Sequence, residues 1–190
     1  TRCKQTISQI LASTGQSRGE SMRRVALDTY LQRLLDDWRV IRPHARISVS
    51  LQGVQPAPLI SAERTLEQAL LNLLDNAADA NGENREALQF FASWDTEHCQ
   101  IEILDRGAGL DEETAQRLGE AFFSTKTATR DPPNGIGIGL FLSNATVERL
   151  GGKVKLFNRA DPQGGACTRV TLPMTRLKAE HHASSSPTTP

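Results

Sequence analysis

Two asparagines, Asn72 and Asn76, lie four residues apart in the stretch LEQALLNLLDNAADA and therefore on one face of a predicted helix. Asparagine is a mediocre helix former, so two of them on one face of a strongly helical segment call for an explanation. One explanation is a solvated polar face, which is the better one for these residues taken alone. The other is a carboxamide oxygen that binds Mg²⁺, an ion that prefers oxygen ligands.

A second stretch, ILDRGAGL, places Asp105, Gly107 and Gly109 at the end of a predicted strand. An aspartate in this position can simply begin the following turn. It can also accept a hydrogen bond from the exocyclic amine of a base, while the glycines allow a flat base to lie against the backbone. Both interpretations stay open at this point.

A third stretch, DPPNGIGIGL, alternates Gly135, Gly137 and Gly139 and runs directly into a predicted helix. A Walker phosphate loop would end in Gly-Lys-Ser/Thr, whereas Leu-Phe follows here. A Rossmann turn would follow a strand, but the preceding residues are polar and rich in proline. Lys126, in the stretch FFSTK just upstream, is by itself an ordinary surface lysine.

Taken in this order, the stretches resemble the N, G1, F and G2 boxes of the GHKL ATP-binding superfamily, and within it the catalytic domain of sensor histidine kinases. The resemblance covers about residues 25–173. Each motif is weak alone, and the order and spacing of all four make the resemblance specific. It implies an α+β fold, a two-layer α/β sandwich of the Bergerat type, with a mixed sheet and helices on one face.

The resemblance also implies ATP and Mg²⁺ as ligands. Asp105 would bind the adenine amino group, Asn76 would hold Mg²⁺, and Asn72 would support the phosphates or the metal's waters. Lys126 and Arg130 would offset phosphate charge, and Asn72, Asn76 and Lys126 would form the catalytic set. The implied nucleotide-binding residues are Asn72, Asn76, Asp105, Gly107, Gly109, Phe122, Lys126, Arg130, Gly135, Gly137, Gly139 and Leu140.

The glycine-rich stretch would then be the hinge of a lid over ATP and a cradle for its phosphates. The N–H groups at the start of the helix from about Gly139 to Leu150 carry a partial positive charge of about half a unit, which suits a triphosphate.

Two positions depart from the family pattern. Asp79 stands where many histidine kinases have a Lys or Arg that helps to hold phosphate. Other cations would then take over, or Asp79 would join the outer shell of the metal. Asn72 stands where hydrolytic members of the superfamily have a glutamate that activates water, and asparagine cannot take a proton. This second departure favours transfer to a protein nucleophile over ATP hydrolysis.

The composition is that of an ordinary globular protein, with 38% hydrophobic and 23% charged residues among 190. The 22 basic residues balance the 22 acidic ones, so a general electrostatic attraction to nucleic acid or membrane is absent. Three widely spaced cysteines argue against a disulfide scaffold or a zinc site. No apolar run reaches the roughly 18 residues that a membrane-spanning helix needs.

Hydrophobic periodicity predicts the elements that must position the motifs. Apolar residues recur at helical spacing from Asp28 to a stop before Pro43, over about residues 62–80, and over about residues 139–150. A short helix is expected from Asp111. Alternating or apolar runs predict strands over about residues 46–51, 57–61, 88–94, 100–104, 153–158 and 168–172.

We expect four parts in the chain: the end of the second helix of a dimerisation and phosphoacceptor hairpin (1–16), a linker (17–24), the GHKL domain (25–174) and a disordered tail (175–190). None of the four histidines lies in a helix before an acidic residue, which is the acceptor context of the family. The acceptor is therefore expected upstream of Thr1. The hairpin and a cognate response regulator would be the partners, with nucleic acid excluded.

The stretch RCKQTISQIL places Cys3 between Arg2 and Lys4, cations that stabilise a thiolate and raise its reactivity. This stretch resembles the redox box of RegB/PrrB-type sensor kinases, although a helical cysteine can have basic neighbours by chance. Cys99 and Cys167 lie in predicted strands and are expected to be small buried residues.

The function predicted is the ATP-binding catalytic domain of a two-component sensor histidine kinase, redox-responsive, that passes the γ-phosphate of ATP to a histidine of the hairpin and thence to the regulator. The full protein would be a homodimer tethered to a bacterial inner membrane, with this piece cytoplasmic and largely monomeric. The alternatives are a GHKL serine kinase or ATPase, against which Asn72 speaks, and a non-catalytic nucleotide-sensing module, which Asp79 keeps open.

Overall fold

The computed structural model describes residues 24–82, 86–110, 138–162 and 164–178. In chain order their elements are β1 (Arg24–Ala26), α2 (Leu27–Ile41), β2 (Ile47–Gly53), β3 (Leu59–Ser61), α3 (Arg64–Asn81), β4 (Leu88–Trp94), β5 (His98–Leu104), α5 (Ile138–Arg149), β6 (Lys153–Asn158), β7 (Ala166–Pro173) and α6 (Met174–Leu177).

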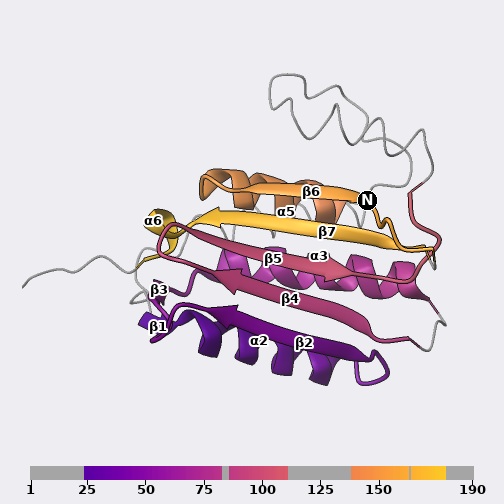
Figure 1. Ribbon diagram of the computed structural model, residues 1–190, viewed down its shortest axis with the longest axis horizontal. Helices are drawn as coiled ribbons and strands as arrows, with labels where there is room; N and C mark the ends of the chain where they lie inside the picture. The colour runs from indigo at the N-terminus through magenta and orange to yellow at the C-terminus, as the bar shows by residue number, and fades with distance from the viewer. Residues whose placement is uncertain (1–23, 83–85, 111–137, 163, 179–190) are drawn as a thin grey trace, which may run out of the picture.

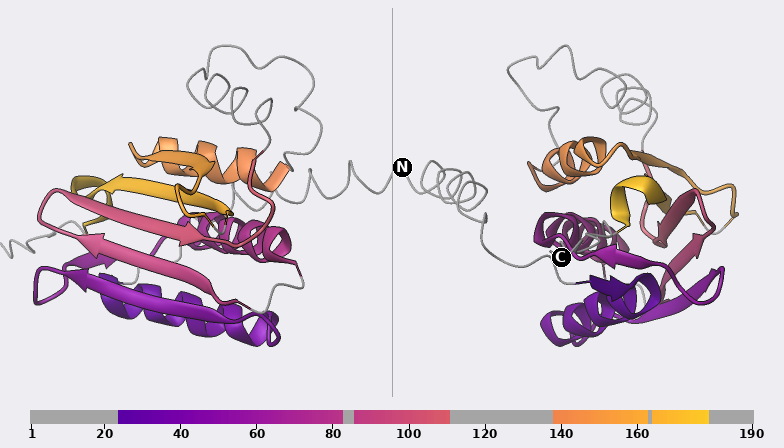
Figure 2. Two further views of the ribbon diagram at one scale, coloured as in Figure 1. Left: turned by 45° about the vertical axis from the view of Figure 1, so that its right-hand side comes forward. Right: turned by 90° about the vertical axis from the view of Figure 1, so that its left-hand side faces the viewer.

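Five strands form one mixed sheet in the order β2-β4-β5-β7-β6. The β2–β4 pair is parallel and the other pairs are antiparallel. Figure 1 shows this sheet in front of the helices, and the right-hand view of Figure 2 shows α2, α3 and α5 together on one of its faces. Strands β1 and β3 pair separately in a short two-stranded sheet. The predicted two-layer α+β fold with a mixed sheet is confirmed.

The core lies between the sheet and the helices. Alternate residues of β4 and β5 point into it, as the twofold side-chain period of a strand requires. Each helix contributes one apolar stripe, and these stripes pack against the apolar face of the sheet in one core layer. Fully buried side chains at this interface include Leu31, Leu35, Trp38, Leu70, Leu73, Leu74, Leu88, Phe90, Ile101 and Ile103.

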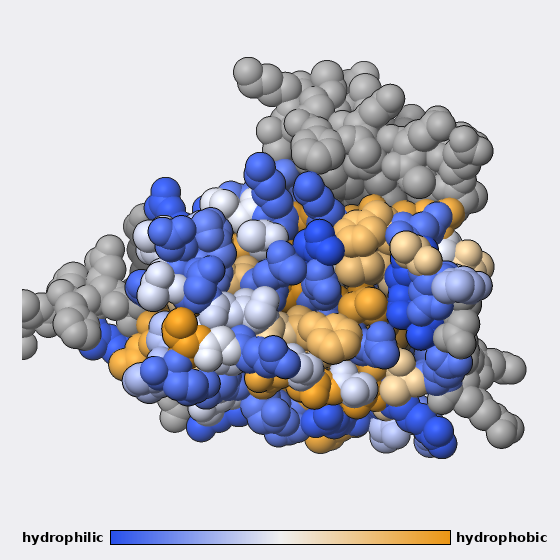
Figure 3. All heavy atoms as spheres, in the orientation of Figure 1, coloured by the Kyte–Doolittle hydropathy of each residue, from blue (hydrophilic) through white to orange (hydrophobic). Residues whose placement is uncertain are grey.

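The opposite face of the sheet is mixed in polarity (Figure 3). Phe91 is exposed on this face, and Arg169 lies 4.9 Å from the centre of the Phe157 ring. Glu102 Oε1 accepts a hydrogen bond from Arg169 Nε at 2.7 Å across the β5–β7 pair. This face is therefore built from cross-strand pairs.

The predicted bounds of β4 and β6 match those observed, and the other elements differ at their ends by about two residues. The sequence did not predict β1 and α6, whereas β3, also three residues long, was predicted from the short apolar run APLIS. The helix predicted from Asp111 lies outside the described residues. No helix in the described part of the chain combines the length and the apolar character needed to cross a bilayer.

Candidate functional site

Asp105 follows β5, and its side chain is almost fully buried, with 3% exposure. Its Oδ1 accepts hydrogen bonds from two backbone N–H groups, those of Gly107 at 2.8 Å and Ala166 at 3.1 Å. Its own backbone N–H donates to the carbonyl of Ala166 at 3.0 Å. Among the described residues, none hydrogen-bonds Oδ2. The carboxylate is thus held rigidly by one oxygen, and the other oxygen retains its full capacity to accept hydrogen bonds.

Gly107 and Gly109 lie where the backbone passes close to other parts of the protein. A Cβ at Gly107 would lie 2.3 Å from the carbonyl oxygen of Ala80 at the end of α3. At Gly109, where φ is +76°, it would lie 2.7 Å from Oδ1 of Asn158. Packing therefore accounts for both glycines, and their predicted contact with a base stays a prediction. The same packing places the Asp105 loop beside the end of α3.

Asn72 and Asn76 lie on α3, with Asn72 half-buried and Asn76 exposed. Oδ1 of Asn72 accepts a hydrogen bond from Gln68 Nε2 at 3.2 Å. A Cβ built on Gly139, at the start of α5, would lie 4.0 Å from Cβ and Cγ of Asn72. The structure thus brings the first asparagine and the last glycine of the predicted motifs together, although 67 positions separate them in the sequence.

The start of α5 is fixed against α3 by a buried hydroxyl. Ser143 Oγ, with the side chain 1% exposed, lies 2.8 Å from the carbonyl oxygen of Gly139 and 3.1 Å from that of Ala69. Leu140 is buried in the hydrophobic core. Because both residues face the protein interior, the backbone at the start of α5 has a defined position relative to Asn72.

Asp79 has a partner that the sequence did not predict. Nη1 of Arg42, at the end of α2, donates to Asp79 Oδ1 at 2.8 Å, and Nε donates to Asp75 Oδ1 at 3.0 Å. Trp38 Nε1 also donates to Asp75 Oδ1, at 3.0 Å. The Asp79 side chain is 66% exposed, so its ion pair adds little stability. The pair suggests a third explanation for an aspartate at position 79: it forms an ion pair between α3 and the end of α2.

Residues 61–176 match the family model described as histidine kinase-, DNA gyrase B-, and HSP90-like ATPase. The chain belongs to this family. It is 34% identical over 136 residues to the sensor protein KdpD of Escherichia coli, a match that covers 71% of this chain and 15% of KdpD. It is 29% identical over 164 residues to the sensor protein FixL of Bradyrhizobium diazoefficiens, covering 83% of this chain and 30% of FixL.

Solved structures of histidine kinases share the fold of this ATPase-family chain. The catalytic domain of histidine kinase ThkA superposes with a TM-score of 0.58 at 22% identity, covering 80% of this chain and 95% of that one. The mycobacterial sensor histidine kinase MprB superposes with a TM-score of 0.57 at 21% identity, covering 84% and 100% of the two chains. The predicted superfamily is confirmed. Its sensor-kinase branch stays a prediction, with which the similarity to sensor proteins agrees. The narrower RegB/PrrB-type resemblance has no specific support among these relatives.

Several residues predicted for the site of this ATPase-family chain lie outside the described part. They are Cys3, Phe122, Lys126, Arg130, Gly135 and Gly137. Their roles stay predictions. Within the described part, the structure gathers Asn72, Asn76, Gly139 and the Asp105 loop along one helix, α3.

The sequence also missed the contacts that surround Asp105. Arg159, in the connection between β6 and β7, donates from Nη1 to the carbonyl oxygen of Asp105 at 2.9 Å. Asn158 accepts from the N–H of Leu110 at 2.6 Å and donates to its carbonyl oxygen at 2.8 Å. No local pattern marks these residues, since their partners are about 50 positions away. Only the run of polar residues after β6 could have drawn attention to them.

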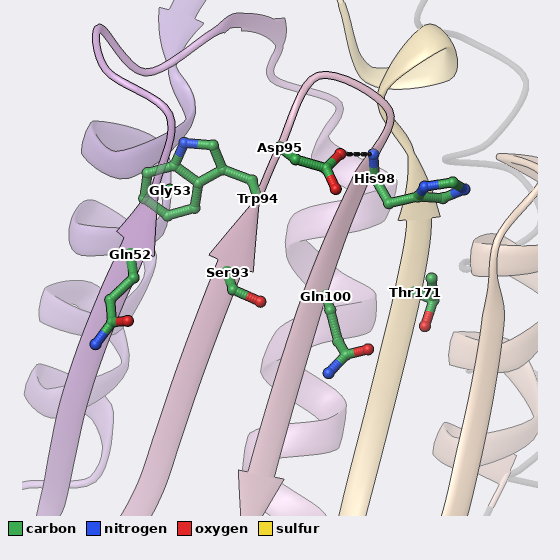
Figure 4. A pocket seen from close by; sticks show the side chains of 8 residues that line it. All are labelled: Gln52, Gly53, Ser93, Trp94, Asp95, His98, Gln100 and Thr171. Carbon is green, nitrogen blue, oxygen red and sulfur yellow. Dashed lines mark hydrogen bonds between the residues drawn. The ribbon is translucent and has the colours of Figure 1, made fainter.

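A separate hollow of about 600 Å³ lies on the open face of the sheet, at the end of β5 away from Asp105 (Figure 4). Side chains of Gln52, Ser93, Gln100 and Thr171 extend from four neighbouring strands into it. Its one carboxylate, Asp95, is occupied in the turn between β4 and β5, accepting from the N–H of His98 at 2.7 Å. Among the described residues that line it, the hollow therefore has no buried carboxylate with one oxygen left to bind a ligand, which is what distinguishes the Asp105 site.

Proposed function

We propose that this chain is the ATP-binding catalytic domain of a two-component sensor histidine kinase. It would transfer the γ-phosphate of ATP to a histidine outside this chain, from which an aspartate of a response regulator receives it. The observation that carries the proposal is the carboxylate of Asp105, buried and anchored through Oδ1, with Oδ2 left to accept a ligand's hydrogen bond. The family match supports ATP as that ligand.

The adenine end of the nucleotide would lie at Asp105. An ionised carboxylate is only an acceptor, so Oδ2 suits the 6-amino group of adenine and disfavours a carbonyl at the same position. Because Gly107 contacts the carbonyl of Ala80, this end of the site lies at the last turn of α3.

The phosphates would lie along α3 toward its middle. Asn72 precedes Ala80 by eight residues, which is about 12 Å along a helix at 1.5 Å per residue and leaves room for an extended nucleotide. The phosphates would then reach the start of α5 at Gly139, where helix N–H groups favour negative charge. Lys126 and Arg130 would add positive charge there.

The residues on α3 fit a hydrated Mg²⁺ ion. Both asparagines offer neutral carboxamide oxygens, and Asn72 Oδ1 keeps a second lone pair beside its bond from Gln68. Asn76 would hold the ion and Asn72 its waters. When bound, Mg²⁺ would neutralise charge that develops on the phosphates. The protein's own part would be positioning, which can supply much of the acceleration in phosphoryl transfer.

Transfer to a protein residue is favoured over hydrolysis by the chemistry of Asn72. A carboxamide cannot accept a proton from water, so Asn72 cannot act as the general base that hydrolytic members of the superfamily have at this position. A GHKL serine kinase or ATPase, or a module that senses nucleotide without turnover, remains the alternative.

The test is phosphotransfer in trans. This chain is mixed with γ-labelled Mg·ATP and the separately expressed hairpin that precedes it in the full-length gene. We expect an acid-labile, alkali-stable label on the hairpin, which is the behaviour of phosphohistidine. Acid-stable label on serine, or free phosphate alone, would assign the chain to the alternatives and contradict the role given to Asn72.

We also propose that Cys3 is a redox-reactive thiol. Burial raises the pKa of the Cys99 thiol to about 12 and that of the Cys167 thiol to about 11, so both stay protonated and unreactive at neutral pH. Cys3, between two basic residues, is then the candidate. Alkylation of the native protein at pH 7.5 should be lost in Cys3→Ser. Equal alkylation of that variant and the parent would contradict the proposal.

We further propose that the full-length protein is a homodimer tethered to a bacterial inner membrane, with this chain in the cytoplasm. Dimerisation would reside in the hairpin, so this chain alone should be largely monomeric. A tight dimer of this chain in gel filtration under reducing conditions would contradict that assignment, and full-length protein in the soluble fraction of lysed cells would contradict the tether.

A further inference from the structure

The connection between β6 and β7 lies beside the end of β5, where the strands meet at one edge of the sheet (Figure 1). Arg159 begins this connection, and its side chain is only 9% exposed. Nη1 donates to the carbonyl oxygen of Asp105 at 2.9 Å. The Asp105 carboxylate accepts hydrogen bonds from the described residues only through Oδ1. Arg159 therefore holds the backbone of the residue whose Oδ2 is left to bind a ligand.

Asp161 connects Arg159 to a second nearly buried arginine. Its Oδ2 lies 3.2 Å from Nη2 of Arg159 and 2.7 Å from Nη1 of Arg106, whose side chain is 12% exposed. Arg106 also pairs through Nε with Oε2 of Glu86 at 3.0 Å. The two guanidinium groups are nearly buried while Asp161 is 29% exposed, so neutralising Asp161 leaves both groups with less compensation for their charge. Asp161 therefore influences both guanidinium groups together.

The two arginines restrain the backbone that follows the Asp105 side chain, at the peptide between Asp105 and Arg106. Arg159 binds the Asp105 carbonyl, and the Arg106 side chain is held by Asp161. The N–H of Arg106 donates to Oδ1 of Asn81 at 2.8 Å, which ties the same peptide to the end of α3. With Oδ1 anchored by two N–H groups, the direction of Oδ2 depends on this backbone.

We propose that Arg159 and Asp161 are positioning residues for adenine recognition, which hold the backbone at Asp105 and Arg106 so that Oδ2 of Asp105 meets the 6-amino group of the base. The inference rests on the proposed function, because it takes Asp105 as the adenine acceptor. Neither residue touches the base. Their effect is on how well Asp105 distinguishes a purine with a 6-amino group from one without it.

The experiment compares the dissociation constants of ATP and of purine riboside 5′-triphosphate, which lacks only the 6-amino group. A hydrogen bond to a charged acceptor gives the wild-type protein a preference of about tenfold or more for ATP. In Asp161→Asn we expect that preference to fall about fivefold, with the affinity for the analogue changed less than about twofold.

Glu102→Gln is the matched control. Glu102 is also a partly buried acid paired with an arginine, at 2.7 Å from Arg169 Nε, and the change likewise converts an acid to its amide. Its pair lies on the open face of the sheet. Both variants should lower the melting temperature, but Glu102→Gln should keep the preference for ATP. A merely stabilising role for Asp161 would make the two variants alike in preference, and that result would overturn the proposal.

Arg159→Lys decides the matter if Asp161→Asn fails to fold. A lysine keeps the charge but has no planar fork, so it cannot bind the Asp105 carbonyl and Asp161 together in the same geometry. We expect a similar loss of preference, and an unchanged preference would overturn the proposal. Failure of the proposed function is separate from either result: a wild-type protein that binds both triphosphates equally would show that Asp105 is not the adenine acceptor.

Discussion

Asp95 and Asp105 follow adjacent strands, β4 and β5, and lie at opposite ends of the sheet. Each uses Oδ1 to accept two backbone N–H groups. For Asp95 the donors are Glu97 at 2.6 Å and His98 at 2.7 Å. For Asp105 they are Gly107 at 2.8 Å and Ala166 at 3.1 Å. In sequence, both are aspartates at the end of a strand.

The two aspartates differ in where the N–H groups that bind Oδ1 come from and in whether the carboxylate is exposed or buried. Both donors of Asp95 belong to its own turn, and Figure 4 shows the bond from His98. The Asp95 side chain is exposed to water. One donor of Asp105 lies 61 positions away, and its side chain is buried. A turn-forming aspartate needs only local geometry. A buried carboxylate with an unused oxygen is instead expected at a binding site.

The largest effect should come from Gly165→Ala, which disturbs only the Asp105 end of the comparison. At Gly165 φ is +94°, and a Cβ would lie 2.1 Å from the carbonyl oxygen of Asp105. The backbone must therefore shift, and we expect the free energy of unfolding to fall by about 3 kcal/mol or more. Urea denaturation measures this fall.

Gly164→Ala is the control for Gly165→Ala. Gly164 also has a positive φ, of +76°, but the nearest atom to its Cβ would be the Gly107 carbonyl oxygen at 4.0 Å. Only the conformational cost of about 1–2 kcal/mol remains. Equal losses for the two variants would mean that close packing against Asp105 is unimportant.

The next effect is on binding. In Asp105→Asn, Oδ1 can still accept both backbone N–H groups, but an amide N–H replaces the accepting Oδ2 and faces the amino group of the base. Losing a hydrogen bond to a charged group should weaken ATP binding about 10- to 100-fold. Titration calorimetry measures the affinity, and a thermal melt checks that the variant is folded. Wild-type affinity in a folded Asp105→Asn would refute the site.

The smallest effect should come from Asp95→Asn, which tests the other end of the comparison. Hydrogen bonds from the N–H groups of His98 and, secondly, Glu97 lower the pKa of the Asp95 carboxyl from 3.8. A lowered pKa in the folded state stabilises the protein above pH 3.8, and this contribution is lost as the pH falls through the folded-state value. Asp95→Asn should remove that part of the acid dependence.

The measurement for Asp95→Asn is a series of thermal melts from pH 7 to pH 2.5, compared with the wild-type protein. We expect a slightly lower melting temperature at pH 7, a smaller difference at the lowest pH, and unchanged affinity for ATP. A loss of ATP affinity at pH 7 would show that the two aspartates are not separate in function.

Much of the fold followed from periodicity, and some of the site did not. Strands β4 and β6 could be predicted to the residue because alternation and turn residues mark their ends. The pairing of Arg42 with Asp79 could not be predicted, because 37 positions separate them and both have ordinary polar surroundings in sequence. The same holds for Arg159 and the Asp105 carbonyl, 54 positions apart.

By itself, the sequence determined the class of fold, the superfamily and the order of the motifs, since these depend on local spacing and residue type. Which aspartate is buried, which glycine lies against which carbonyl, and which arginines surround Asp105 were decided only by tertiary structure. Burial and hydrogen bonding at Asp105 depend on α3, β5 and the β6–β7 connection lying together at one end of the sheet. These segments are far apart in the sequence, so a local sequence pattern cannot indicate that they are in contact.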